Sequence, residues 1–135
     1  MILLLHTVVT WALVGLIWTV QLVIYPLFSQ IGTDAFRSYH VRYMMRVGFV
    51  VAPLMFAELG TAALLIYLGE RSPWFLMSLL LLALIWLSTW RVQIPLHTRL
   101  EHGFDSTTHE KLVRSNWLRT AAWSLRGVCM LALAL

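Results

Sequence analysis

The sequence predicts an all-α membrane protein, a four-transmembrane-helix bundle with both chain termini on the non-cytoplasmic side. Hydrophobic residues make up 60% of the 135 residues and charged residues only 12%, which is far more apolar than an ordinary soluble domain. The apolar residues also fall in runs long enough to cross a bilayer. The distribution of lysine and arginine between the loops gives the orientation. The length allows a single domain, residues 1–135.

The apolar runs place four spans at about residues 2–27, 40–68, 74–98 and 108–135. The first run has no formally charged side chain up to Phe28, and it is too long and lacks the basic start of a signal peptide. Pro26 is expected to end or kink this helix. A basic, amphipathic segment at 35–46 precedes the second span, which holds one acid, Glu58. Residues 69–73 form a short turn before the third span.

Two helix starts carry capping residues. Gly32 begins a turn in which Thr33 or Asp34 is expected to cap the second helix. Thr107 and Glu110 fit a capping box, T-x-x-E, at the start of the fourth helix.

Basic residues lie mostly in the loops that follow the first and third spans. These residues are Arg37, Arg42, Arg46, Arg99, Lys111 and Arg114, whereas the opposite side holds only Arg71. The positive-inside rule then places these loops in the cytoplasm, as in a multi-pass protein of the cell (inner) membrane. The isoelectric point of about 9.8 therefore indicates topology and contact with lipid headgroups, and no nucleic-acid partner is expected. A lone cysteine, Cys129, excludes an intramolecular disulfide and a cysteine-based metal motif.

The last span contains Arg119 and Arg126, which share one helix face with Asn116 and Trp123. A charged side chain in a spanning helix normally faces the bundle interior and has a partner there. Counted from the cytoplasmic ends, Glu58 and Arg126 both lie about 16 Å deep, near the middle of a roughly 30 Å core. We therefore predict a buried Glu58–Arg126 ion pair that locks the second helix to the fourth.

A second group of polar side chains is expected to converge at the cytoplasmic end of the bundle. Its members are Gln21, Tyr25, His40, Gln93, His97, Asn116 and Arg119, with Trp86, Trp90 and Trp123 lining the space beneath them. An apolar pocket with a few convergent polar groups is the usual form of a ligand site. Such a pocket suits a planar apolar molecule with an anionic or phenolic group, which Arg119 would hold. His6 is expected at the outer end, and His102 and His109 in solvated loops.

Three functions are compatible with these residues. The first is a membrane oxidoreductase or oxygenase that acts on an apolar aromatic or quinone-like molecule. In it, His97 is the base and Asn116 and Arg119 stabilise the developing anion. The second is a haem-binding protein with His40 and His97 as axial ligands. The third is a non-enzymatic small subunit or assembly partner of a larger membrane complex. The sequence is also compatible with a homo-oligomer. Whether the chain is an enzyme stays open, and no metal other than haem iron is expected.

Several segments resemble those of the anthrone oxygenase-like family of small four-helix membrane proteins. They are Y-P-L-F after the first span, A-P-L-M in the second, V-Q-I-P-L-H-T-R-L closing the third and S-N-W-L-R-T opening the fourth. Gln93 and His97 stand at the polar positions of that family's N-x-P-I-N-type segment. Asn116 and Arg119 match the end of its W-x-x-x-H-x-x-R-type segment. The resemblance implies cofactor-independent oxygenation of a phenolic polycycle.

The first half of the chain also resembles the small membrane protoporphyrinogen oxidase family. His6, the F-R-x-Y-H-x-R-Y segment and Pro53 carry this second resemblance. It implies association with haem, but the second half of the chain does not match that family.

Overall fold

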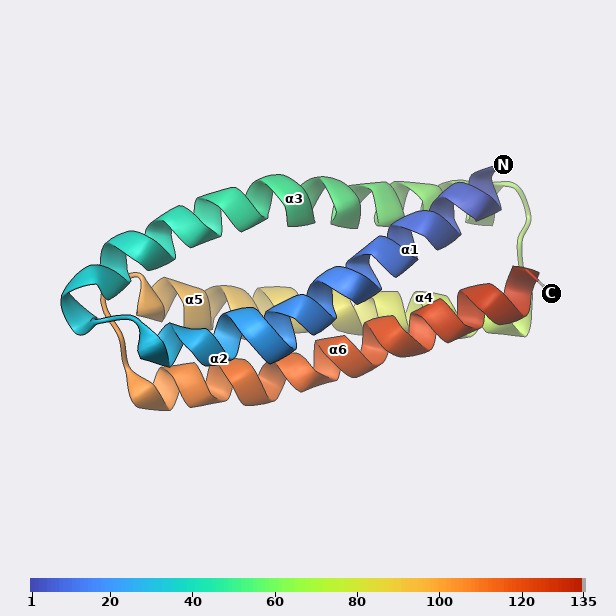
Figure 1. The fold of residues 1–135 in the computed structure, drawn as a ribbon. Helices are drawn as coiled ribbons and strands as arrows, with labels where there is room; N and C mark the ends of the chain where they lie inside the picture. Colours follow the sequence, from blue (N-terminus) through green and yellow to red (C-terminus); the bar gives the residue numbers. More distant parts are fainter. Residues whose placement is uncertain (135) are drawn as a thin grey trace.

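Four antiparallel helical rods lie side by side in the computed structural model, which describes residues 1–134 (Figure 1). The first rod consists of α1 (Ile2–Thr19), the π-helical turn η1 (Val20–Ile24), α2 (Tyr25–Leu27) and the 3₁₀ turn η2 (Phe28–Gln30). The second rod is α3 (Thr33–Tyr67). The third consists of α4 (Pro73–Ser88), the π-helical turn η3 (Thr89–Gln93) and α5 (Ile94–Leu100), and the fourth is α6 (Ser106–Ala134). The predicted all-helical class is confirmed.

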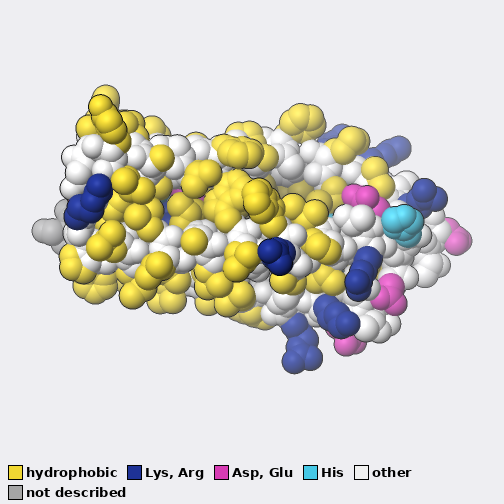
Figure 2. Space-filling model, turned by 180° about the vertical axis from the view of Figure 1, so that it is seen from behind, with side chains coloured by type: hydrophobic (Ala, Val, Ile, Leu, Met, Phe, Trp, Pro, Cys, Tyr) yellow, Lys and Arg dark blue, Asp and Glu magenta, His cyan; other side chains and the backbone are white. Residues whose placement is uncertain are grey.

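Three of these rods, Ile2–Gln30, Thr33–Tyr67 and Pro73–Leu100, are long and apolar enough to cross a membrane. Hydrophobic side chains cover most of the length of the surface, while charged side chains gather mainly at one end (Figure 2). Large apolar residues such as Phe49 and Leu80 are exposed along the rods. A soluble protein rarely exposes so much contiguous apolar surface, whereas a lipid-facing one must.

The two ends of the bundle differ in charge. The N-terminus, the α3–α4 turn and the end of α6 lie at one end (Figure 1). The loops after η2 and α5 lie at the opposite end, and this is the end where the charged side chains gather.

Helix ends follow capping chemistry, but not always at the predicted residue. The N-cap of α3 is Gly32, so the expected cap at Thr33 or Asp34 is wrong. At α6 the Thr108 N–H donates to Oδ2 of Asp105 over 2.7 Å, and this carboxylate takes the place of the predicted capping box. Ser72 caps α4 by accepting from the Phe75 N–H.

A glycine ends α3 where the chain turns back towards α4. Gly69 has φ +90°, a left-handed conformation that only glycine adopts without strain. Its N–H donates to the Ile66 carbonyl, and the Glu70 N–H donates to the Leu65 carbonyl. These bonds satisfy carbonyl groups that the end of the helix would otherwise leave open.

The two π-helical turns sit at corresponding places in the first and third rods. Each ends two residues before a proline, Pro26 or Pro95. A proline cannot donate to the carbonyl one turn back and its ring crowds that carbonyl, and a wider turn relieves both conflicts. The first rod therefore does not end at Pro26 but continues to Gln30. Single π-helical turns of this kind are frequent at functional sites.

The rods do not pack equally closely. α6 packs along both α4 and α1, and α3 packs mainly along α1. The backbones of α3 and α4 stay further apart along most of their length. The candidate site lies in the space between these two helices.

Candidate ligand-binding site

Glu58 and Arg126 form the predicted ion pair. Nη2 of Arg126 lies 3.0 Å from Oε1 of Glu58, and neither side chain is exposed. Thr10 and Trp123 also donate to the Glu58 carboxylate, over 3.0 and 3.2 Å. Nη1 of Arg126 donates to the carbonyl of Ser78. The pair thus connects α3 and α6 with α1 and α4, and its charges are well supplied with hydrogen bonds.

His6, which was expected at the outer end of the bundle, belongs to this buried network. It is fully buried, with Nε2 3.3 Å from Nη2 of Arg126 and Nδ1 2.7 Å from Oγ1 of Thr61. Because an arginine only donates, Nε2 of His6 must accept, and the ring proton lies on Nδ1.

Arg119 is held by a chain of amides. Its Nη1 donates to Oδ1 of Asn116 over 3.1 Å, and Nδ2 of Asn116 donates to Oε1 of Gln21 over 2.8 Å. Nε2 of Gln21 donates to the carbonyl of Val113. The Arg119 guanidinium carbon also lies 5.1 Å from the centre of the Trp123 ring, within the range of a cation–π interaction. These contacts fix the guanidinium without neutralising it.

The glutamine of the second π-helical turn also contacts α6. Nε2 of Gln93 donates to Oγ of Ser115 over 2.9 Å, while Oε1 of Gln93 is buried without a partner. Gln21 lies in the first π-helical turn, so the two turns present glutamines to α6 from two different rods.

A row of hydrogen-bonded rings continues from Arg119 towards the charged end of the bundle. The hydroxyl of Tyr25 lies 2.8 Å from Nε2 of His97, and Nδ1 of His97 lies 3.0 Å from Nε2 of His40. The two imidazoles are stacked with ring centres 5.3 Å apart. His109, expected in a solvated loop, is instead buried and donates from Nε2 to the carbonyl of Tyr25.

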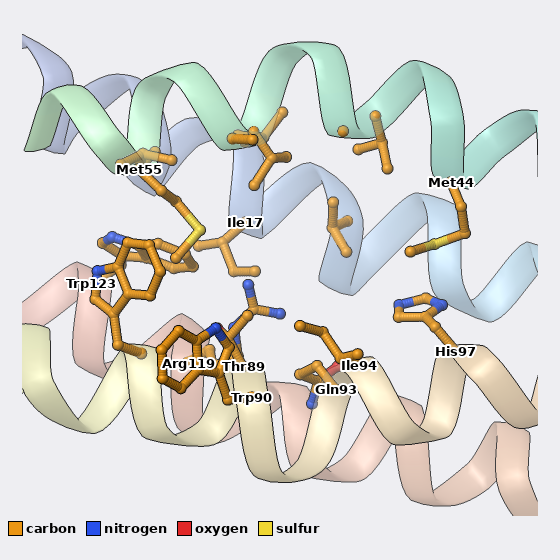
Figure 3. Close-up of a pocket in the computed structure, with 18 of the residues that line it drawn as sticks. Ile17, Met44, Met55, Thr89, Trp90, Gln93, Ile94, His97, Arg119 and Trp123 are labelled. Atoms are coloured by element: carbon orange, nitrogen blue, oxygen red, sulfur yellow. The ribbon is translucent and has the colours of Figure 1, made fainter.

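A cavity of about 330 Å³ lies between α3 and the third rod and is closed from behind by α1 and α6. Figure 3 shows Arg119 extending into it from α6, with His97 and Met44 at one end and Met55 and Trp123 at the other. Two lining side chains, Trp90 and Phe56, are 65% and 63% exposed. The cavity therefore opens on the apolar outer face of the bundle, between α3 and α4.

Three buried polar atoms on residues that line this cavity have no hydrogen-bond partner. Two are donors, Nε of Arg119 and Nε1 of Trp86, and one is an acceptor, Oε1 of Gln93. A buried polar atom without a partner destabilises the fold, and each such case requires an explanation.

The predicted site residues divide into two groups. Those lining the cavity are Tyr25, Trp86, Trp90, Gln93, His97, Arg119 and Trp123. The other three, Gln21, His40 and Asn116, lie behind this wall and hydrogen-bond to residues nearer the cavity. The α3 side of the lining, which includes Met44, Gly48 and Met55, was not predicted, because apolar residues on a spanning helix look alike whether they face lipid or a cavity.

The geometry does not fit His40 and His97 as an axial pair for haem. Axial ligands approach the iron from opposite faces of the porphyrin. Here the two facing nitrogens are 3.0 Å apart and share a hydrogen bond, so neither the metal nor the ring fits between them. Among residues 1–134, no group of three or more histidine, cysteine, aspartate or glutamate side chains is arranged to hold a metal ion.

No protein-family model, curated protein or solved structure matches the chain. The two family resemblances in the sequence therefore stay predictions.

Proposed function

We propose that the protein spans the cell (inner) membrane four times and binds a planar, mostly apolar aromatic molecule with a phenolic or quinone oxygen. The fourth span would be α6, whose two arginines lower its hydropathy. Arg126 is fully buried and Arg119 only 6% exposed, so both charges face the bundle interior and not the lipid. The positive-inside rule then places both termini outside.

The observation that carries the proposal is the set of three unpartnered polar atoms on residues that line the cavity. A carbonyl or phenolate oxygen accepts hydrogen bonds, as Nε of Arg119 and Nε1 of Trp86 require. A phenolic hydroxyl donates one, as Oε1 of Gln93 requires. Most of the rest of the lining is apolar or aromatic, which suits the ring system of such a molecule.

The proposed activity is that of an oxidoreductase or oxygenase that needs no resident cofactor. The buried guanidinium of Arg119 would stabilise a phenolate by preorganised electrostatics. His97 lines the same cavity and would be the base that takes up the phenolic proton, through the Tyr25 hydroxyl that lies 2.8 Å from its Nε2. In an oxygenase, molecular oxygen would be the oxidant of the resulting anion.

A binding experiment with matched ligands tests the ligand class. We expect naphthoquinone and its quinol to quench the tryptophan fluorescence of the purified protein, and naphthalene, which lacks the oxygens, to bind much more weakly. The Arg119→Gln substitution should weaken quinone binding roughly 10- to 100-fold, as expected for the loss of a charged hydrogen bond. Arg91→Gln is the matched control, because Arg91 is exposed and does not line the cavity.

Two results would contradict the proposal. Equal affinities for naphthalene and naphthoquinone would show that the polar atoms do not select the ligand. Equal effects of Arg119→Gln and Arg91→Gln would show that Arg119 is not its contact. Oxygen uptake with anthrones and quinols tests the oxygenase activity separately, and its absence with a ligand that binds would leave a binding protein.

A further inference from the structure

We propose that Tyr25, His97 and His40 form a relay that moves one proton between the cavity and the charged end of the bundle. This inference rests on the proposed function only for the molecule that gives or takes the proton. The relay itself follows from the hydrogen bonds of the three side chains.

The three side chains form an unbroken row that leads away from the cavity. Tyr25 and His97 line the cavity, while His40 lies behind them and is fully buried. Neighbouring members are 2.8 and 3.0 Å apart, and both nitrogens of His97 are used. The far nitrogen of the row, Nδ1 of His40, is buried and has no partner. A buried polar atom without a partner is an exception that requires an explanation.

Two proton arrangements keep all three side chains neutral and both hydrogen bonds intact, since a neutral imidazole carries its proton on one nitrogen only. In the first, His40 Nε2–H donates to His97, His97 Nε2–H donates to Tyr25, and the Tyr25 hydroxyl donates into the cavity. In the second, the Tyr25 hydroxyl donates to Nε2 of His97, and Nδ1–H of His97 donates to Nε2 of His40. The proton of His40 then lies on Nδ1, which has no hydrogen-bond partner.

These two arrangements are the start and the end of one proton transfer. The Tyr25 O–H bond breaks as its proton passes to an oxygen of the bound molecule. His97 gives its Nε2 proton to Tyr25, and His40 gives its Nε2 proton to Nδ1 of His97. A proton from the charged end then binds Nδ1 of His40, so one proton enters for each one that leaves and no side chain stays charged. The reverse sequence removes a proton from the bound molecule.

The charged and titratable groups around the row fit this direction of transfer. At the cavity end, Arg119 and Tyr43 lie close to Tyr25, and Arg119 would hold the oxygen that exchanges the proton. At the far end, the partly exposed carboxylate of Glu101 acts on His40. His109 faces the row from α6 through its bond to the Tyr25 carbonyl. Glu101 is the acid that would exchange protons between His40 and water.

A measurement without ligand tests the row itself. In the purified protein with ¹⁵N-labelled histidine, we expect a scalar coupling across the His97–His40 hydrogen bond and exchange of both rings between their two neutral tautomers. His102, exposed near the end of α5, is the internal control and should show no such coupling. A single fixed tautomer for His97 and His40 would overturn the relay whether or not any ligand binds.

A chromophoric phenol tests transfer into the cavity. After a rapid pH change, a bound nitronaphthol changes colour at the rate at which its oxygen exchanges a proton. His40→Gln keeps a polar side chain but cannot exchange protons by changing tautomer. We expect it to slow the colour change by about 10²-fold, the lower end of the usual effect of a positioned proton-transfer group. His102→Gln should leave the rate unchanged.

The outcomes separate the relay from the proposed function. If the nitronaphthol binds but His40→Gln exchanges protons as fast as the natural protein, the relay is wrong and the binding proposal stands. If the nitronaphthol does not bind, the proposed function fails, and the tautomer exchange of His97 and His40 still decides on the relay.

Discussion

Oε1 of Glu58 lies 3.0 Å from Nη2 of Arg126, and neither side chain is exposed. Trp123 donates to the same carboxylate and also lines the cavity. The Arg119 guanidinium lies over the Trp123 ring. Trp123 therefore contacts both the ion pair that joins α3 to α6 and the cavity. Through Trp123, the ion pair helps to position the end of the cavity that lies furthest from His97.

The Glu58→Gln substitution should strongly destabilise the protein, because it leaves the Arg126 charge buried without its counter-charge. Removal of one partner of a buried pair typically costs about 3–5 kcal/mol. The free energy of unfolding, measured by denaturant titration in detergent, gives the effect. The double substitution Glu58→Leu with Arg126→Leu should recover most of the loss, since it removes both charges together. A double variant less stable than Glu58→Gln would show that the pair is not the main contribution.

The ion pair could be predicted from the sequence because it depends on helix rise alone. The rise is constant, so counting residues from the loops places Glu58 and Arg126 at the same depth. The inward direction of Arg119 follows in the same way from the high cost of exposing its charge to lipid. These predictions need no knowledge of how one helix is rotated against its neighbours.

Other parts of the site depend on rotation, which the sequence does not specify. A helical wheel places Trp90, Gln93 and His97 on one face, yet Trp90 is 65% exposed while Gln93 and His97 are buried. The π-helical turn Thr89–Gln93 adds a residue to one turn and rotates everything after it by about 100°. The burial of His6 and His109 was not predicted, for a related reason. Their burial is decided by partners on other helices, Arg126 and Tyr25.

The Asn116→Leu substitution should weaken both stability and ligand binding. It removes the acceptor for Nη1 of Arg119 and the donor to Oε1 of Gln21. Loss of a partner for a buried polar group costs about 1–3 kcal/mol, which unfolding in detergent would measure. Quinone titration would show the accompanying loss of affinity as Arg119 becomes less well positioned. Thr98→Ala is the control, because Thr98 is exposed and bonds only to its own helix. Equal losses in the two variants would contradict the positioning role of Asn116.

The start of α6 should lose stability in acid through Asp105. Hydrogen bonds from the side chain and backbone of Thr108 lower the pKa of Asp105 below its ordinary value. Because the folded pKa is the lower one, the stabilisation is present above the unfolded pKa and is lost as the pH falls through the folded pKa. Hydrogen exchange of the Thr108 amide should therefore speed up in acid.

Asp105→Asn should remove most of this pH dependence, whereas Asp34→Asn should not, since Asp34 makes no such bond at α3. Exchange that stays unchanged as the pH falls would count against this cap.

The Gly48→Leu substitution should weaken ligand binding at least tenfold without unfolding the protein. Gly48 lines the cavity on α3, and a Cβ added there meets no atom within 4 Å, so a leucine side chain has room to enter the cavity and fill it. Replacing a glycine inside a helix also raises the free energy of unfolding by about 0.5–1 kcal/mol, so the variant should be at least as stable as the natural protein.

Gly60→Leu is the matched control. Gly60 lies on the same helix with equally open surroundings but does not line the cavity. Quinone affinity should fall at least tenfold, more than about 1.4 kcal/mol of binding free energy, in Gly48→Leu only. An equal loss in both variants would mean that the ligand does not occupy the space between α3 and α4.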